Sequence, residues 1–191
     1  MELSQRLAIY NMCKTTMRKT SWDKTGEFYL SDSDLEVYDI DSLKDKYYEQ
    51  HQLPTGEKVS SCDALYIDEQ TMYLIEFKNM TFENVMKGRI RGEVKEKLSA
   101  SLLILTDILE IGISKTRENT NFILIYNDAK GRFAAELSRR VAPENNADKL
   151  KKYENIYYKQ CLTLDSEEFQ KSFVDEWELD EKRKKTEGVS S

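Results

Sequence analysis

Two charged residues, Glu76 and Lys78, stand inside the apolar stretch TMYLIEFKNM, residues 71–80. The apolar run predicts a buried strand, in which a charge is costly unless it is paired or used. Alternate residues of a strand share a face, so one face is expected to hold Leu74, Glu76 and Lys78, with Phe77 on the other. An acid and a base are therefore predicted side by side at one place in a sheet.

A second acid, Asp63, belongs to the preceding strand-like run VSSCDALYI, and the short linker DEQT predicts a hairpin between the two runs. Counting back from a turn near Glu69–Gln70 places Asp63 opposite residues near 76, on the same side of the sheet. Two adjacent carboxylates repel each other unless a cation lies between them, and their hard oxygens suit Mg²⁺ or Mn²⁺. Lys78 can then hold or activate a water, or stabilise charge on a phosphate. Such a set suffices to hydrolyse a phosphodiester.

Other catalytic arrangements have little support in the sequence. The single histidine, His51, lies in a polar turn region, which argues against a Ser-His-Asp or Cys-His site. The cysteines lack the spacing of a zinc site; they are Cys13, Cys62 and Cys161. Gly88 and Gly92 fall in a helical pattern without the Lys-Ser/Thr of a phosphate-binding loop. Carboxylates and lysines remain as the candidate catalytic groups.

Asp63 together with Glu76-Phe77-Lys78 resembles the PD-(D/E)xK phosphodiesterase superfamily, which has the restriction-endonuclease-like fold. The resemblance covers about residues 58–128, and Cys62 replaces the proline that names the motif. It implies an α/β fold with a four-stranded mixed central sheet flanked by helices. It also implies that Asp63, Glu76 and the backbone carbonyl of Phe77 bind the metal, and that Lys78 assists the attacking water.

The position of the motif distinguishes it from three other matches to (D/E)-x-K, which begin at Glu93, Asp128 and Asp180. These lie in a predicted helix, after a strand end and near the C-terminal tail. Only Glu76 lies inside an apolar strand with an acid on a partner strand. The alternative interpretation is a structural one, in which Glu76 and Lys78 form an edge-strand pair with their charged ends in water.

A row of basic residues at four-residue spacing, Lys87, Arg91 and Lys95, occupies one face of the helix predicted over residues 83–111. Such a row beside a metal site is expected to bind a nucleic-acid backbone. The alternative is a solvated helix face with ion pairs such as Glu93–Lys97. A second basic cluster, at 130–140, has the same ambiguity.

The remaining patterns predict elements around the hairpin. Helical periodicity indicates a helix over 2–19, a short helix capped by Asp41, and a long helix that ends at Gly112. Strands are expected at 121–128 and within 153–165, followed by a last helix capped by Asp165 and Glu168. A single domain is expected over residues 1–180, with a charged, flexible tail at 181–191.

Charge and composition limit the classes of partner that can be expected. The chain has 191 residues and a formal net charge of −6, and 39% of its residues are hydrophobic. Residues 23–49 hold nine acids against three lysines, and residues 165–187 hold nine acids against five basic residues. The middle of the chain is near neutral, so a polyanion partner is compatible with it. No apolar run suits a membrane span or a signal peptide, which predicts a cytoplasmic protein.

Two functions from different classes follow. The first is a Mg²⁺- or Mn²⁺-dependent nuclease acting on nucleic acid, with DNA favoured over RNA. The second is a non-catalytic protein on a similar scaffold that binds a partner protein through its acidic flanks. The sequence leaves the substrate, endonuclease or exonuclease action, and the oligomeric state open.

Overall fold

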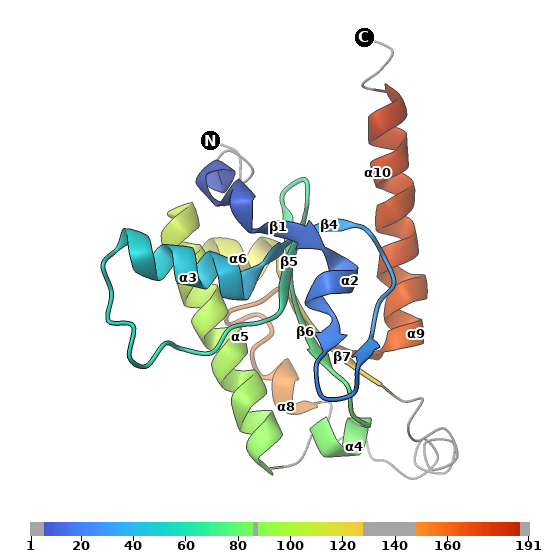
Figure 1. Cartoon of the computed structure of the whole chain (residues 1–191), viewed down its shortest axis with the longest axis horizontal. Helices are drawn as coiled ribbons and strands as arrows, with labels where there is room; N and C mark the ends of the chain where they lie inside the picture. The colour runs from blue at the N-terminus through green and yellow to red at the C-terminus, as the bar shows by residue number, and fades with distance from the viewer. Residues whose placement is uncertain (1–5, 86–87, 128–147, 188–191) are drawn as a thin grey trace.

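A six-stranded mixed sheet forms the centre of the protein, with helices on both of its faces (Figure 1). The computed structural model describes residues 6–85, 88–127 and 148–187. The strand order is β1-β4-β5-β6-β7-β8. Strands β1, β4, β5 and β6 pair antiparallel, and β6, β7 and β8 pair parallel. The fold is therefore mixed α/β, as predicted, although the sheet has six strands rather than four.

The strands of the main sheet are β1 Lys14–Thr16, β4 Glu36–Asp39, β5 Ala64–Asp68, β6 Thr71–Lys78, β7 Thr120–Tyr126 and β8 Gln160–Asp165. A separate small hairpin pairs β2 Trp22–Asp23 with β3 Phe28–Tyr29. The helical elements are η1 Ala8–Cys13, α2 Met17–Thr20, α3 Ile40–Gln50, α4 Phe82–Val85, α5 Gly88–Leu109, α6 Ile113–Asn119, α8 Asp148–Lys151, α9 Ser166–Phe169, η3 Gln170–Val174 and α10 Asp175–Glu187. None of the helices in the described ranges is long and apolar enough to cross a membrane.

Two apolar layers lie on opposite faces of the sheet, and the alternation of β6 decides which residue enters which layer. Leu74 packs in the layer beneath α3 and α5, whereas Ile75 and Phe77 pack in the layer beneath α2, α9 and α10. Leu65 of β5 shares the layer of Leu74. The predicted division of the hairpin into two faces is confirmed, and it puts Glu76 on the side of α5.

The β5–β6 hairpin has the predicted register. Asp68 pairs with Thr71 across a two-residue turn, and Ala64 pairs with Ile75. In the turn, Glu69 adopts φ 51°, a left-handed conformation that a tight hairpin needs. The ladder ends at the pair with Ile75, and the Asp63 N–H donates to the carbonyl of the same residue, Ile75, at 3.0 Å, so Asp63 lies at the strand end next to Glu76.

The N-terminal segment differs from the prediction of one helix over 2–19. It forms the 3₁₀ helix η1, then strand β1, then the short helix α2 capped by the Thr16 hydroxyl. Pairing of β1 with β4 supplies hydrogen bonds that interrupt the helix. Tyr10 and Met17 are still buried. The apolar periodicity therefore predicts these core residues correctly, but it predicts the wrong backbone conformation.

Helix ends account for most of the other differences. Asp39, not Asp41, caps α3 by accepting a hydrogen bond from the Ser42 N–H at 3.1 Å. Helix α5 ends with Glu110 in a left-handed conformation, φ 50°, and Gly112 is the N-cap of α6 rather than a C-cap. The predicted cap Asp165 is confirmed at α9, where its carboxylate accepts from the Glu168 N–H.

The C-terminal elements are more ordered than expected. Within 153–165 only the last six residues form strand β8. Helix α10 continues to residue 187, so residues 181–187, which the sequence assigned to the charged tail, are helical. Trp177 anchors this helix, because its ring is buried against Tyr66 and Tyr73 with centroids at 4.3 and 4.7 Å.

Candidate active site

Asp63 sits where the ladder between β5 and β6 ends. Its backbone still pairs with β6, through the bond to Ile75. Its side chain then continues the pairing, since Oδ2 accepts a hydrogen bond from the Phe77 N–H at 2.6 Å. The second carboxylate oxygen, Oδ1, is left facing the side of Glu76. The end of a strand thus fixes the direction of the Asp63 carboxylate.

Glu76 is fully buried, with a side-chain exposure of 0%. It lies in a central strand, where it pairs with Leu124 of β7, so its carboxylate is in the interior of the protein. Lys78, two residues along the same face, places Nζ 2.8 Å from Glu76 Oε1. The structure therefore brings together the predicted pair of Glu76 and Lys78. The pair lies in the interior of the protein and not at a solvent-exposed edge of the sheet.

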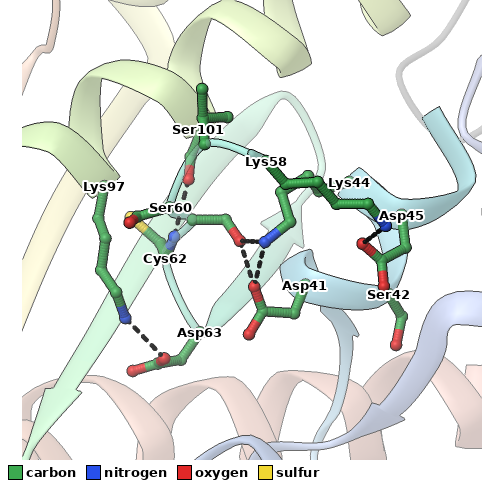
Figure 2. Close-up of polar contacts among 12 residues, drawn as sticks. Asp41, Ser42, Lys44, Asp45, Lys58, Ser60, Cys62, Asp63, Lys97 and Ser101 are labelled. Carbon is green, nitrogen blue, oxygen red and sulfur yellow. Dashed lines mark hydrogen bonds and ion pairs between the residues drawn. The ribbon is translucent and has the colours of Figure 1, made fainter. Parts of the chain in front are cut away.

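Lys97 of helix α5 completes the cluster and was not predicted. Its Nζ lies 2.8 Å from Glu76 Oε1 and 3.4 Å from Asp63 Oδ1, and it donates to Glu76 Oε2 at 3.0 Å. Figure 2 shows the Lys97 side chain extending from α5 to Asp63. The cation between the two carboxylates in this structure is therefore an ammonium group.

A signal for Lys97 was present in the helical periodicity. The apolar stripe of α5 includes Val94, Leu98 and Leu102, all buried. Lys97 and Ser101 fall between these residues, at three- and four-residue spacing, and so lie on the face turned toward the sheet. We interpreted Lys97 only as a surface partner of Glu93, because helix spacing alone does not reveal acids on a neighbouring strand.

The electrostatics of the cluster follow from its burial. Burial, followed by the negative charge of Glu76, raises the pKa of Asp63 from 3.8 to about 7. Burial alone would lower the pKa of Lys97, but the Asp63 and Glu76 carboxylates outweigh it and raise that pKa above its ordinary value. The lysine thus remains charged, and Asp63 is the group whose charge changes near neutral pH.

Glu76 Oε1 has two ammonium groups close to it but no well-aligned hydrogen bond. Both lysine ammonium groups lie at 2.8 Å from it, yet in the described part of the chain no group makes a hydrogen bond of good geometry to this atom. It is a buried anionic oxygen held by charge alone. Such an oxygen is a hard, anionic ligand of the kind that binds Mg²⁺ or Mn²⁺.

The donor set available to a metal is small. Asp63 and Glu76 supply two carboxylates, and the described residues contain no group of three or more His, Cys, Asp or Glu side chains arranged to hold a metal. The Phe77 carbonyl, between the acid and the lysine in the chain, stays a predicted third ligand. Mg²⁺ commonly keeps several waters and takes one or two carboxylates, so this set fits that ion.

The two described members of the predicted basic row do not point at the carboxylates. Lys87 is outside the described residues, as is the cluster at 130–140. Arg91 and Lys95 are half-buried on α5. At about 100° per residue, Lys95 points roughly 200° around the helix from Lys97, and Arg91 roughly 120° away. Lys97 is directed at the carboxylates, whereas the described side chains of Arg91 and Lys95 are not.

A cavity of about 420 Å³ opens beside the cluster. Asp63, Phe77, Lys78 and Lys97 form one wall, and residues of the segment 20–30 form the other. Asp63 is 22% exposed and Lys78 16% exposed, whereas Glu76 lies behind them. A ligand in this cavity would thus meet Asp63 and both lysines directly.

A second polar network supports the loop that leads into Asp63 (Figure 2). The buried Lys44 ammonium donates to Asp41 at 2.7 Å and to Ser61 at 3.0 Å, and Ser61 donates to Asp41. The Cys62 N–H donates to the Ser101 hydroxyl at 2.8 Å. These bonds fasten residues 61 and 62 to α3 and α5, so the approach to Asp63 is rigid.

Comparisons of this chain with protein-family models, with curated proteins and with solved structures gave no match.

Removal of the Lys97 charge is expected to destabilise the protein. Lys97→Met leaves the buried Glu76 with one ammonium partner, and breaking a buried ion pair costs on the order of 3 kcal/mol. Chemical denaturation of Lys97→Met, with Lys95→Met as the matched control on the same helix, measures this loss. An equal effect of the two substitutions would contradict the ion-pair geometry.

The raised pKa of Asp63 predicts an unusual pH dependence of stability. Between about pH 4 and pH 7 the folded carboxyl holds a proton that the unfolded one has released, so its contribution to stability is full below pH 4 and lost as pH rises to about 7. Denaturation across this range should show a slope for the wild type that Asp63→Asn reduces. An identical slope in both proteins would refute the assignment.

Proposed function

We propose that this protein is a metal-dependent nuclease with a restriction-endonuclease-like fold, a member of the PD-(D/E)xK type. The observation that carries the proposal is the convergence of Asp63 and Glu76 on one cation position, with Lys78 beside it and a cavity in front. Geometry of this kind is a stronger argument than the motif, because three other (D/E)-x-K matches occur in the chain.

The roles follow from position. Asp63 Oδ1 and Glu76 Oε1 would hold Mg²⁺ or Mn²⁺, with the Phe77 carbonyl as a further ligand. Bound there, the metal supplies a water of lowered pKa and stabilises charge on a phosphate. Lys78, partly exposed to the cavity, orients that water. The Phe77 N–H holds the remaining Asp63 oxygen, which keeps the carboxylate in place.

Two features depart from the pattern of the superfamily. The sheet has six strands in this chain, and Cys62 stands where the motif has proline. Cys62 is fully buried and its N–H is bonded to Ser101, so the approach to Asp63 is fixed by hydrogen bonds instead of a proline ring. Neither feature changes the position of the acids.

One observation favours a second candidate, a non-catalytic protein on this scaffold that binds a partner protein. Lys97 and Lys78 already balance the charges of Asp63 and Glu76, so the cluster is electrically complete without a metal. A cluster of this kind can serve stability alone. Helix α10 and the acidic flanks would then supply the partner surface. Metal binding separates the two candidates.

Cleavage assays test the nuclease directly. We expect the wild type to cut DNA or RNA in Mg²⁺ or Mn²⁺, and Asp63→Asn, Glu76→Gln and Lys78→Ala each to lower the rate by at least about a hundredfold. Lys95→Ala, on α5 but directed away from the cavity, is the control that should stay near wild-type activity. Thermal melts confirm folding of each variant. Cleavage that survives all three substitutions would refute the assignment.

Metal affinity gives a test that is independent of activity. The Lys97 ammonium contacts the same two carboxylate oxygens that a metal would use, so the two cations compete. Calorimetric titration with Mn²⁺ should therefore show tighter binding in Lys97→Met than in the wild type, by about tenfold, or roughly 1.4 kcal/mol. Lys97→Arg should stay close to the wild type.

The same titration can decide between the candidate functions. Absence of Mn²⁺ binding in both proteins would favour the non-catalytic candidate. Binding in the wild type that weakens in Lys97→Met would instead show that the lysine assists the metal.

A further inference from the structure

The wall of the cavity opposite the carboxylates is built by a small hairpin. Strands β2 and β3 form a separate two-stranded sheet. Helix α2 precedes this sheet in the chain, and Leu30 follows it. Thr20, Trp22, Asp23, Thr25 and Gly26 all line the cavity. A ligand that reaches Lys78 therefore lies against this hairpin.

The hairpin is tied to the end of strand β6. The Asn79 side chain, one residue after Lys78, donates to the Asp23 carboxylate at 2.5 Å. Asn127 in turn donates to Asn79 at 2.7 Å, which extends the bond to the end of β7. Asp23 also accepts from the N–H groups of Thr25 and Gly26 at 3.1 and 3.0 Å. The position of the hairpin is thus fixed relative to Lys78.

Gly26 is required for this close approach. A Cβ built at this position would lie 2.7 Å from Asp23 Oδ2 and in contact with the Asn79 amide. A side chain here would displace the Asp23 carboxylate or the Asn79 amide, the two groups whose bond ties the hairpin to the end of β6. The turn therefore has the one residue that allows the Asp23–Asn79 bond.

Trp22 is one of the residues that line the cavity, and core packing does not cover its side chain. Its side chain is among the exposed large apolar groups, at 38%, whereas Leu30 at the end of the same segment is buried. The Trp22 ring packs on Tyr29 with centroids 4.5 Å apart, and the Arg18 guanidinium lies 4.7 Å from the Tyr29 centroid. A cross-strand aromatic pair stabilises a hairpin, but that role does not require Trp22 to lie at a cavity that two lysines also line.

We propose that Trp22 is a nucleobase-stacking site, which holds the base of an unpaired nucleotide next to the phosphate at Asp63, Lys78 and Lys97. This inference deepens the proposed function and rests on it for the identity of the ligand. A base next to a phosphate combines a flat aromatic ring with an anion, and the residues that line the cavity include one aromatic residue with an exposed side chain, Trp22, and two lysines, Lys78 and Lys97.

The site selects unpaired over paired substrate. The faces of a base in a duplex are covered by its neighbours, so a ring that stacks in a cavity must come from a single strand, a frayed end or an extruded nucleotide. No sequence pattern predicts such a surface, because Arg18, Trp22 and Tyr29 are separated along the chain by mostly charged and polar residues. The hairpin brings them to one place.

Binding in EDTA, where no metal-dependent cleavage takes place, tests the site. A short single-stranded oligonucleotide and the blunt duplex of the same sequence serve as probes. Trp22→Ala should weaken single-strand binding by about tenfold and leave duplex binding unchanged. Phe28→Ala is the matched control, because Phe28 is more exposed, at 47%, and lies in the same hairpin but does not line the cavity.

Fluorescence supplies a second readout that does not depend on Trp22→Ala folding. The chain has two tryptophans, and Trp177 is only 5% exposed. The single strand should quench the wild-type emission and have little effect on Trp22→Phe, in which only the buried tryptophan remains. Quenching that is unchanged in Trp22→Phe would overturn the proposal. So would an equal loss of single-strand and duplex binding in Trp22→Ala, or the same loss in Phe28→Ala.

The outcomes separate this site from the proposed hydrolysis. Single-strand binding that depends on Trp22, without cleavage in Mg²⁺ or Mn²⁺, would support the stacking site and contradict the nuclease. Metal-dependent cleavage that is unaffected by Trp22→Ala would support the nuclease and contradict the stacking site.

Discussion

The buried carboxylate of Glu76 is the constraint on which the rest of the site depends. A charge with no exposure, in the third strand from one edge of the sheet, is stable only if opposite charges reach it. Lys78 reaches it along the same strand and Lys97 reaches it from helix α5. Asp63, fixed by the Phe77 N–H, then shares Lys97 with it. The packing of α5 against β6 is therefore tied to the charge balance of the cluster.

The part of the site that local rules control was predictable from the sequence. Alternation along β6 put Glu76 and Lys78 on one face, and a two-residue turn set the register that brings Asp63 to Glu76. Lys97 was missed because it joins the cluster through tertiary packing, in which a helix crosses the sheet at a particular point. Its place between Val94 and Leu98 on the buried stripe was the available signal, since a lysine on such a face needs a partner.

The errors in the fold have related causes. Periodicity located the buried residues of the N-terminal segment correctly, but it did not show that pairing of β1 with β4 would replace helical hydrogen bonds. Gly112 begins a helix rather than ending one, because Glu110 already provides the left-handed residue after α5. The charged residues after 180 continue a helix that starts from the buried Trp177. In each case a neighbouring element decided between conformations that the local sequence allows.

We propose that Asp63 and Glu76 share one metal position, beside which the Lys97 ammonium lies in this structure. The most direct measurement is a crystal structure determined in Mn²⁺, with anomalous scattering used to locate the ion. We predict an anomalous peak that contacts both Asp63 Oδ1 and Glu76 Oε1, with the Lys97 ammonium moved away from the two oxygens. A saturated crystal in which Lys97 still bridges the carboxylates, and no Mn²⁺ lies between them, would contradict the account.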